Sequence, residues 1–226
     1  MDIPAYAVPR THICRAVFFD MDGTLVDSTP VVEQVWSEFA IRYDLDYAEI
    51  IRTSHGVQAL DTVRRFAPAG ADVLALAAEL GAMERGRTEG IMPLPGAGEL
   101  LHSLPSDAVA LVTSADRILA DLRMDAAGLT MPATAVTADL ITRGKPHPEG
   151  YLLAAELLGV QPADALVFED APAGIAAALA AGIRTVAVGA NTGPLPEGVL
   201  HINDYSSVQA TVETDATGSR TISFRL

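Results

Sequence analysis

Short apolar runs alternate with longer amphipathic segments along most of this chain. Apolar runs without polar alternation are typical of strands that are covered on both faces, as in parallel sheets. The segments between them stop at glycine, which commonly follows the last turn of a helix. We therefore expect strands at residues 16–19, 108–112, 134–136, 165–168, 185–188 and 199–202, with helices at 117–127, 149–158 and 172–181.

This alternation predicts a series of βαβ crossovers. The expected fold class is α/β, with a doubly wound and mainly parallel sheet between layers of helices. A last alternating stretch places Ile222, Phe224 and Leu226 on one side of what we expect to be an edge strand.

One region lacks strand-like runs and carries helical patterns instead, at residues 31–43, 57–66 and 73–87. We expect residues 28–92 to form a small helical domain inserted into a core made of residues 1–27 and 93–226. The exit of the insertion, residues 90–96, is rich in glycine and proline and is a natural hinge.

Composition narrows the class of protein further. The chain has 226 residues, of which 50% are hydrophobic and 19% charged, so it has the material for a sizeable core. A formal net charge of −14 opposes binding to nucleic acid and to anionic membranes. Cys14 is the only cysteine, and residues 1–10 contain no apolar signal segment, so we expect a cytoplasmic protein. The oligomeric state stays open, with a monomer as the simplest expectation.

Two aspartates follow the first buried strand directly. Asp20 and Asp22 are two residues apart, so in an extended chain both carboxylates can converge on one point beyond the strand. Asp, Gly and Thr after a strand often form only a turn. A calcium loop is disfavoured, because Gly23 is the fourth residue of the motif and a strand precedes it. Close carboxylates instead call for a shared proton or a bound cation.

Further polar residues follow other predicted strands. Thr113 and Ser114 come after one strand, and Glu169 and Asp170 after another. The carboxyl ends of parallel strands form the edge where α/β sheets bind ligands. Lys145 is the only lysine among the 15 lysines and arginines, and its compact ammonium group suits a phosphoryl oxygen beside a carboxylate.

Together these residues predict phosphoryl transfer to a carboxylate. Mg²⁺ would be held by Asp20, Asp170 and water, because it prefers oxygen ligands. Asp20 would attack phosphorus, and Asp22 would protonate the leaving group and later activate water. The remaining members of the constellation would hold the phosphoryl oxygens, namely Thr113, the Ser114 N–H and Lys145. Glu169 is a further candidate metal ligand or a partner of one.

Four ordered motifs resemble those of the haloacid dehalogenase superfamily, over about residues 14–205. They are Asp20 to Thr24, Thr113 to Ala115, Gly144 to Pro146 and Glu169 to Gly174. The resemblance implies a Rossmann-like core, a helical cap, Mg²⁺ dependence and the roles given above, with the Asp22 backbone carbonyl as an additional metal ligand. The dehalogenases of this family lack an acid at the position of Asp22, so a phosphatase, that is a phosphomonoester hydrolase, or a mutase is expected and not a dehalogenase.

Within the superfamily, the cap sequence resembles phosphatases of 2-deoxyglucose 6-phosphate, glycerol phosphate and related polyol phosphates. The resemblance places His55, Gly56 and Gln58 near the substrate, although relatives usually carry arginine where this chain has Gln58. The expected substrate is therefore a small phosphorylated sugar or polyol. Two alternatives remain: a sugar phosphomutase with the same core, and a non-catalytic module in which Asp20 accepts a phosphoryl group as a signal.

Overall fold

The computed structural model describes residues 11–190 and 194–226, so residues 1–10 and 191–193 of the predicted core lie outside the described part. Six parallel strands form the main sheet in the order β6-β5-β2-β7-β8-β9. Their bounds are β2 (Ala16–Phe19), β5 (Val109–Val112), β6 (Thr134–Val136), β7 (Ala165–Glu169), β8 (Arg184–Val188) and β9 (Leu200–Ile202). The predicted α/β fold with a parallel sheet is confirmed.

The strand order places the first strand of this sheet, β2, in the middle. The chain winds outward from β2 to β6 and then returns to lay β7 on the other side of β2. This reversal between β2 and β7 is the switch point at which doubly wound sheets bind ligands.

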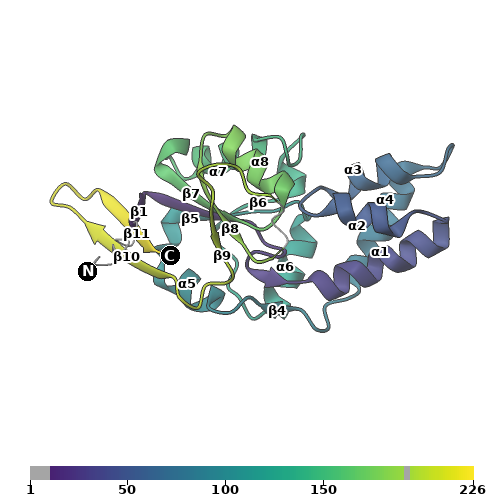
Figure 1. The fold of residues 1–226 in the computed structure, drawn as a ribbon, viewed down its shortest axis with the longest axis horizontal. Helices are drawn as coiled ribbons and strands as arrows, with labels where there is room; N and C mark the ends of the chain where they lie inside the picture. The colour runs from purple at the N-terminus through teal and green to yellow at the C-terminus, as the bar shows by residue number, and fades with distance from the viewer. Residues whose placement is uncertain (1–10, 191–193) are drawn as a thin grey trace, which may run out of the picture.

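Helices cover both faces of the sheet (Figure 1). Their bounds are α5 (Ala97–Ser103), α6 (Arg117–Ala126), α7 (Glu149–Leu157) and α8 (Pro172–Ala180), with short 3-10 turns at Ser106–Ala108, Ala138–Leu140 and Pro162–Asp164. Among the described residues, no helix has the length and apolar character needed to span a bilayer.

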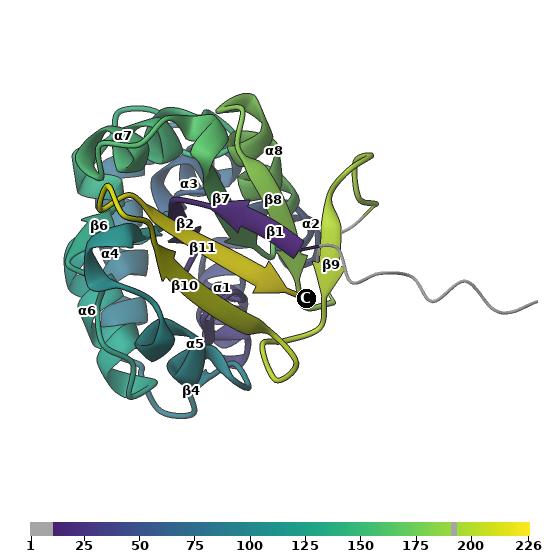
Figure 2. The ribbon, with the colours of Figure 1, turned by 90° about the vertical axis from the view of Figure 1, so that its left-hand side faces the viewer.

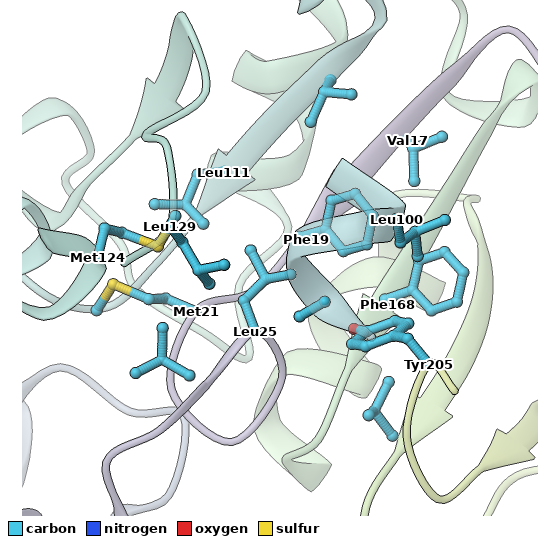
Figure 3. Packing of buried hydrophobic residues seen from close by; sticks show 14 of the residues in the cluster. Val17, Phe19, Met21, Leu25, Leu100, Leu111, Met124, Leu129, Phe168 and Tyr205 are labelled. Carbon is cyan, nitrogen blue, oxygen red and sulfur yellow. The ribbon is translucent and has the colours of Figure 1, made fainter. Parts of the chain in front are cut away.

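The core has two apolar layers because successive strand side chains point to opposite faces of the sheet. Phe18 packs with residues of α7 and α8 on one face, and Phe19 packs with residues of α5 and α6 on the other. The rings of Phe19 and Phe168 stack with centroids 5.1 Å apart, and Tyr205 lies edge-on to both (Figure 3). This packing anchors β2 and β7 beside each other immediately before the acidic residues.

Four helices form a separate unit at one end of the molecule (Figure 1), with bounds α1 (Thr29–Tyr43), α2 (Tyr47–Ser54), α3 (Ala59–Phe66) and α4 (Val73–Arg85). We call α1–α4 the helical unit. It has its own apolar cluster, centred on Trp36, Phe39, Ile50 and Leu80. Helix α2 was not among the predicted patterns. Its N-cap is Asp46, whose side chain accepts a hydrogen bond from the Glu49 N–H.

Two short strands join the helical unit to the rest of the chain. Strand β3 (Val26–Asp27) enters the unit and β4 (Met92–Pro93) leaves it, and the two pair antiparallel with Asp27 opposite Met92. Both crossings therefore lie side by side, beside the loop that carries Asp22.

A second, antiparallel sheet lies at the opposite end of the molecule from the helical unit (Figures 1 and 2). It contains β1 (Thr11–Cys14), β11 (Arg220–Arg225) and β10 (Gln209–Thr214) in that order. The expectation of a C-terminal edge strand was wrong, since β11 pairs on both sides. The N-terminal strand covers its far side, and Ile222 and Phe224 are fully buried against the core.

A glycine in α8 allows this helix to begin close to the end of β7. A Cβ atom on Gly174 would lie 1.5 Å from Oε1 of Glu169, a contact that no side chain can make. The buried Glu169 carboxylate thus occupies space that any other residue at position 174 would need.

Gly174→Ala should therefore destabilise the protein by about 1–3 kcal/mol, as expected for overpacking of a core. Thermal unfolding would measure the loss. Gly98→Ala is the matched control, because a Cβ on this helical glycine would meet only the Leu129 side chain at 3.4 Å. Equal melting temperatures for the two variants would contradict the packing argument.

Candidate active site

The carboxyl edge of the main sheet brings three acidic side chains together. Asp20 follows β2, while Glu169 ends β7 and Asp170 follows it, and the two strands are neighbours with Phe19 opposite Phe168. One oxygen from each of the three carboxylates lies within 4.8 Å of the others, and all three residues are buried. The predicted convergence of these residues therefore occurs in the structure.

Gly23 allows the chain to turn tightly beside this cluster. Its φ of +79° belongs to the left-handed region that glycine adopts without strain, and a Cβ there would lie 2.1 Å from Oδ2 of Asp170. The turn thus brings the loop after Asp22 against the Asp170 carboxylate.

Lys145 lies among the acids, in the loop before α7. Its Nζ donates hydrogen bonds to Oδ1 of Asp20 at 2.5 Å and to Oε1 of Glu169 at 2.6 Å. Glu169 also accepts from the Tyr151 hydroxyl at 2.9 Å and from the Ala171 N–H at 3.1 Å. Both oxygens of Glu169 are occupied by donors, so this carboxylate holds Lys145 in place.

The electrostatics of the cluster favour a divalent cation. Three carboxylates against one ammonium group leave two uncompensated negative charges in a buried place. Burial is the main cause that raises the pKa of Asp20 to about 7; Lys145 opposes this shift and Glu169 adds to it. Burial, followed by repulsion from Asp20 and Glu169, also raises the pKa of Asp170 well above its ordinary value. Such a set of hard oxygen donors fits a divalent metal.

A cavity of about 100 Å³ separates this edge from the helical unit. Asp20, Asp22 and Asp170 line it from the core, together with Thr113 and Ser114 at the end of β5. Thr113 is buried, and its hydroxyl oxygen accepts a hydrogen bond from the Ala115 N–H at 3.1 Å. Five of the predicted site residues thus share one cavity, whereas Glu169 and Lys145 are not among the residues that line it.

The turn between α2 and α3 forms the opposite wall. His55 and Gly56 line the cavity, and the Gly56 carbonyl accepts a hydrogen bond of 2.7 Å from the Ser114 hydroxyl. Gln58 instead packs against Gly144, where a Cβ would lie 2.8 Å from its Cγ. The structure therefore brings two of the three expected cap residues to the cavity, with the third against the loop of Lys145.

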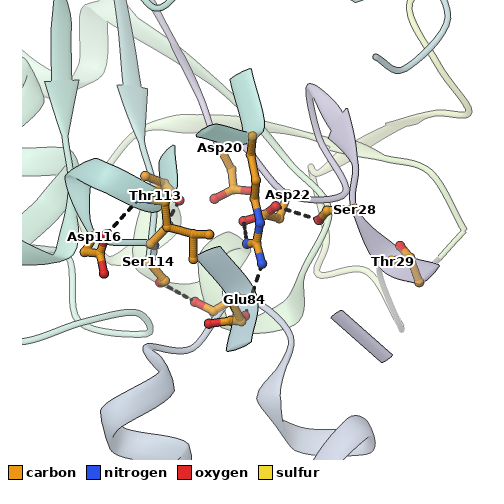
Figure 4. A network of polar contacts seen from close by, with 12 residues as sticks. Asp20, Asp22, Ser28, Thr29, Glu84, Thr113, Ser114 and Asp116 are labelled. Atoms are coloured by element: carbon orange, nitrogen blue, oxygen red, sulfur yellow. Dashed lines mark hydrogen bonds and ion pairs between the residues drawn. The ribbon is translucent and has the colours of Figure 1, made fainter. Parts of the chain in front are cut away.

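Sequence reasoning missed three residues in this region, namely Ser28, Glu84 and Arg123. Asp22 accepts a hydrogen bond from the Ser28 hydroxyl at 2.6 Å (Figure 4). It also forms an ion pair with Arg123 at 2.7 Å, and Arg123 pairs with Glu84 as well. Arg123 lies between buried residues of α6, including Ala120 and Met124. An arginine on the apolar stripe of a helix was the one signal available in the sequence.

Magnesium should stabilise the protein more at about pH 7.5 than at about pH 5. Folding raises the pKa of Asp20 from its ordinary acidic value to about 7, so between those values the folded state binds more protons than the unfolded state. The stability of the metal-free protein therefore falls as pH rises through this window. At about pH 5 a cation must displace the proton of Asp20, whereas at about pH 7.5 the carboxylate is mostly ionised already. Magnesium therefore binds more weakly, and stabilises the protein less, at the lower pH.

Thermal unfolding with Mg²⁺ or EDTA at both pH values would measure this linkage. Asp20→Asn is the control, because its amide cannot titrate. In this variant the magnesium-induced shift of the melting temperature should differ less between the two pH values. A magnesium-induced shift that is equal at both pH values in the unmodified protein would contradict the assignment.

Comparisons with known proteins agree with this geometry. Residues 14–182 match the family of haloacid dehalogenase-like hydrolases. The chain is 45% identical over 181 residues to hexitol phosphatase A of Escherichia coli (strain K12), covering 78% of this chain and 84% of the relative. It is 34% identical over 197 residues to glycerol-1-phosphate phosphohydrolase 1 of Saccharomyces cerevisiae, covering 82% and 79%.

Among solved structures, a putative β-phosphoglucomutase from Bacteroides vulgatus is similar with a TM-score of 0.69 and 31% identity, covering 85% of each chain. The family match spans most of the chain and includes every motif of the acidic cluster. The chain therefore belongs to the haloacid dehalogenase-like hydrolase family.

Proposed function

We propose that this chain is a Mg²⁺-dependent phosphatase of small sugar or polyol monophosphates that works through an aspartyl-phosphate intermediate. The observation that carries the proposal is the pair Asp20 and Asp22 at one cavity, with Asp170 and Lys145 beside Asp20. The relatives named for hexitol and glycerol-1-phosphate support the class of substrate.

Asp20 is the nucleophile. One of its oxygens forms a bond to phosphorus while the bond from phosphorus to the leaving oxygen breaks and its electron pair stays on that oxygen. Asp22 gives that oxygen a proton, so the product leaves as an alcohol. A bound Mg²⁺, held by Asp20, Asp170 and the Asp22 backbone carbonyl, with Glu169 close by, would screen the nucleophile from the charge of the phosphate.

The second step reverses the proton transfer. Asp22, now a carboxylate, takes a proton from water as the water oxygen attacks phosphorus. The bond between phosphorus and the Asp20 oxygen breaks, which releases inorganic phosphate and restores the carboxylate. The Thr113 hydroxyl, the Ser114 N–H and the Lys145 ammonium stabilise the phosphoryl oxygens in both steps.

Residues 28–92 act in this proposal as a cap that selects the leaving group, over a core of residues 1–27 and 93–226. The cap supplies His55 and Gly56 to the cavity wall, with Gln58 beside them. The small volume of the cavity favours a compact substrate.

A phosphatase is favoured over a phosphomutase by the charges around the cavity. A mutase must hold a second phosphate while its bisphosphate intermediate turns over. Arg123 is the one lysine or arginine among the described residues that line the cavity, and two carboxylates already pair with it. Asp22 also disfavours a passive phosphoryl acceptor, because an acid/base at this position speeds loss of the group.

The central test is phosphate release from a panel of sugar and polyol monophosphates with Mg²⁺ and without a bisphosphate activator. Asp20→Asn should lower kcat by at least about a thousandfold, because the amide is a poor nucleophile. EDTA should abolish phosphate release by the unmodified enzyme. Asp121→Asn, an exposed exchange on α6, serves as control. Turnover by the Asp20 variant, or activity that survives EDTA, would refute the mechanism.

Asp22→Asn should discriminate between leaving groups. An alkoxide needs a proton as it leaves, whereas 4-nitrophenolate departs as a stable anion. We expect kcat/KM for a polyol phosphate to fall about 10²–10⁴-fold, the usual contribution of general acid catalysis, and kcat/KM for 4-nitrophenyl phosphate to fall far less. Because kcat/KM reports only steps up to the first irreversible one, the later hydrolysis does not obscure the comparison. Equal losses on both substrates would argue against an acid role for Asp22.

A further inference from the structure

We propose that Arg123 is a positioning residue that orients the carboxyl group of Asp22 for proton transfer and joins it to the helical unit through Glu84. The inference rests on the proposed function, in which Asp22 is the acid and base. Nothing in the motifs that define the site includes Arg123 or Glu84, so the assignment depends on the tertiary structure.

The guanidinium group bridges two carboxylates from different parts of the fold. Nη1 of Arg123 lies 2.7 Å from Oδ2 of Asp22, and Nη2 lies 3.1 Å from Oε1 of Glu84. Arg123 comes from α6 of the core and Glu84 from α4 of the helical unit. The side chains of Arg123 and Glu84 are 4% and 9% exposed, so this bridge is shielded from solvent screening.

Asp22 is held at both of its oxygens. The Ser28 hydroxyl donates to Oδ1 at 2.6 Å (Figure 4), and Arg123 donates to Oδ2 at 2.7 Å. Two donors on opposite oxygens fix the rotation of a carboxyl group that otherwise faces the cavity. Proton transfer needs hydrogen-bond distance to the leaving oxygen, and a misplacement of about 1 Å can cost about a hundredfold in rate.

Glu84 explains how a permanent cation can adjoin this acid. The guanidinium is always charged, and Glu84 balances that charge independently of Asp22. Arg123 can therefore orient the Asp22 group both before and after it gives up its proton. The planar fork of arginine also reaches both carboxylates at once, which a lysine ammonium cannot reproduce.

A purely structural explanation fits these contacts less well. Arg123 lies beside Leu119, Ala120 and Met124 on the buried face of α6, where an apolar residue would pack without the desolvation cost of an ion pair. Docking of the helical unit also does not require it, because Arg85 of α4 already forms an ion pair of 2.6 Å with Asp116 at the start of α6. That second bridge does not contact Asp22.

The step that Arg123 supports is the first proton transfer. As the Asp20 oxygen bonds to phosphorus and the leaving oxygen takes the electron pair of the broken bond, the Asp22 proton moves to that oxygen. A misoriented Asp22 impairs this step only when the leaving group needs a proton. Loss of Arg123 should therefore resemble a weaker form of the loss of Asp22 itself.

The test compares kcat/KM on a polyol phosphate and on 4-nitrophenyl phosphate in the full-length protein. Arg123→Met/Glu84→Leu removes both charges together, so no unpaired buried carboxylate of Glu84 remains. We expect kcat/KM to fall about 30- to 100-fold on the polyol phosphate and less than about threefold on the aryl phosphate. Arg123→Lys keeps the charge without the fork and should show the same selectivity with a smaller loss, of about three- to tenfold.

Arg85→Met is the matched control, since it breaks the other bridge between α4 and α6 and should leave the ratio of the two kcat/KM values unchanged. Equal losses on both substrates in the double variant, wild-type behaviour of Arg123→Lys, or a selective loss in Arg85→Met would overturn the positioning role. Asp22→Asn separates the two hypotheses. If it shows selective loss and the Arg123 variants do not, only this inference fails. If it shows none, the acid role in the proposed function fails.

Discussion

The burial of three carboxylates around one ammonium group is the constraint on which this site depends. Asp20, Glu169 and Asp170 lie close together out of solvent, and Lys145 compensates only one of their charges. Such a cluster is unfavourable unless protons or a cation complete it. Burial raises the pKa of Asp20 to about 7, and the same excess of negative charge makes the cluster suitable for a divalent cation.

The fold makes this arrangement possible by placing two parallel strands side by side and ending both at the same edge. Aromatic stacking of Phe19 on Phe168 holds the strands where the acids begin. Two close approaches of the backbone complete the site, because Gly23 passes beside Asp170 and Gly174 beside Glu169. Side chains at either glycine would displace a carboxylate, so local backbone geometry and charge placement are linked.

The helical unit makes polar contacts at the cavity and keeps most of its apolar residues in its own cluster, although Val31 of α1 packs in the core layer that contains Phe19. The Ser114 hydroxyl contacts the Gly56 carbonyl, and Arg123 contacts Glu84. A polar junction of this kind favours relative motion of two units more than an apolar one does. Arg123 also contacts both Asp22 and Glu84 of the helical unit, so it links the orientation of Asp22 to the position of that unit. Apolar side chains could not form such a link with a carboxylate.

Local patterns in the sequence were sufficient for the parallel strands, for helices α6, α7 and α8 and for the acidic strand ends, since these depend on residues that are neighbours in the chain, whereas α5 was missed. They also indicated that Lys145 and the two acidic pairs would meet, because parallel strands end at one edge. The partners of Asp22 could not be predicted in this way, because Arg123 lies 101 residues after Asp22 in the chain and Glu84 lies 39 residues before Arg123. The sequence likewise did not predict that β11 is the middle strand of the antiparallel sheet or that Gln58 packs on Gly144. Such pairings leave no periodic or motif signal, because only the packing of the helical unit and the N-terminal strand against the core decides which side chains face one another.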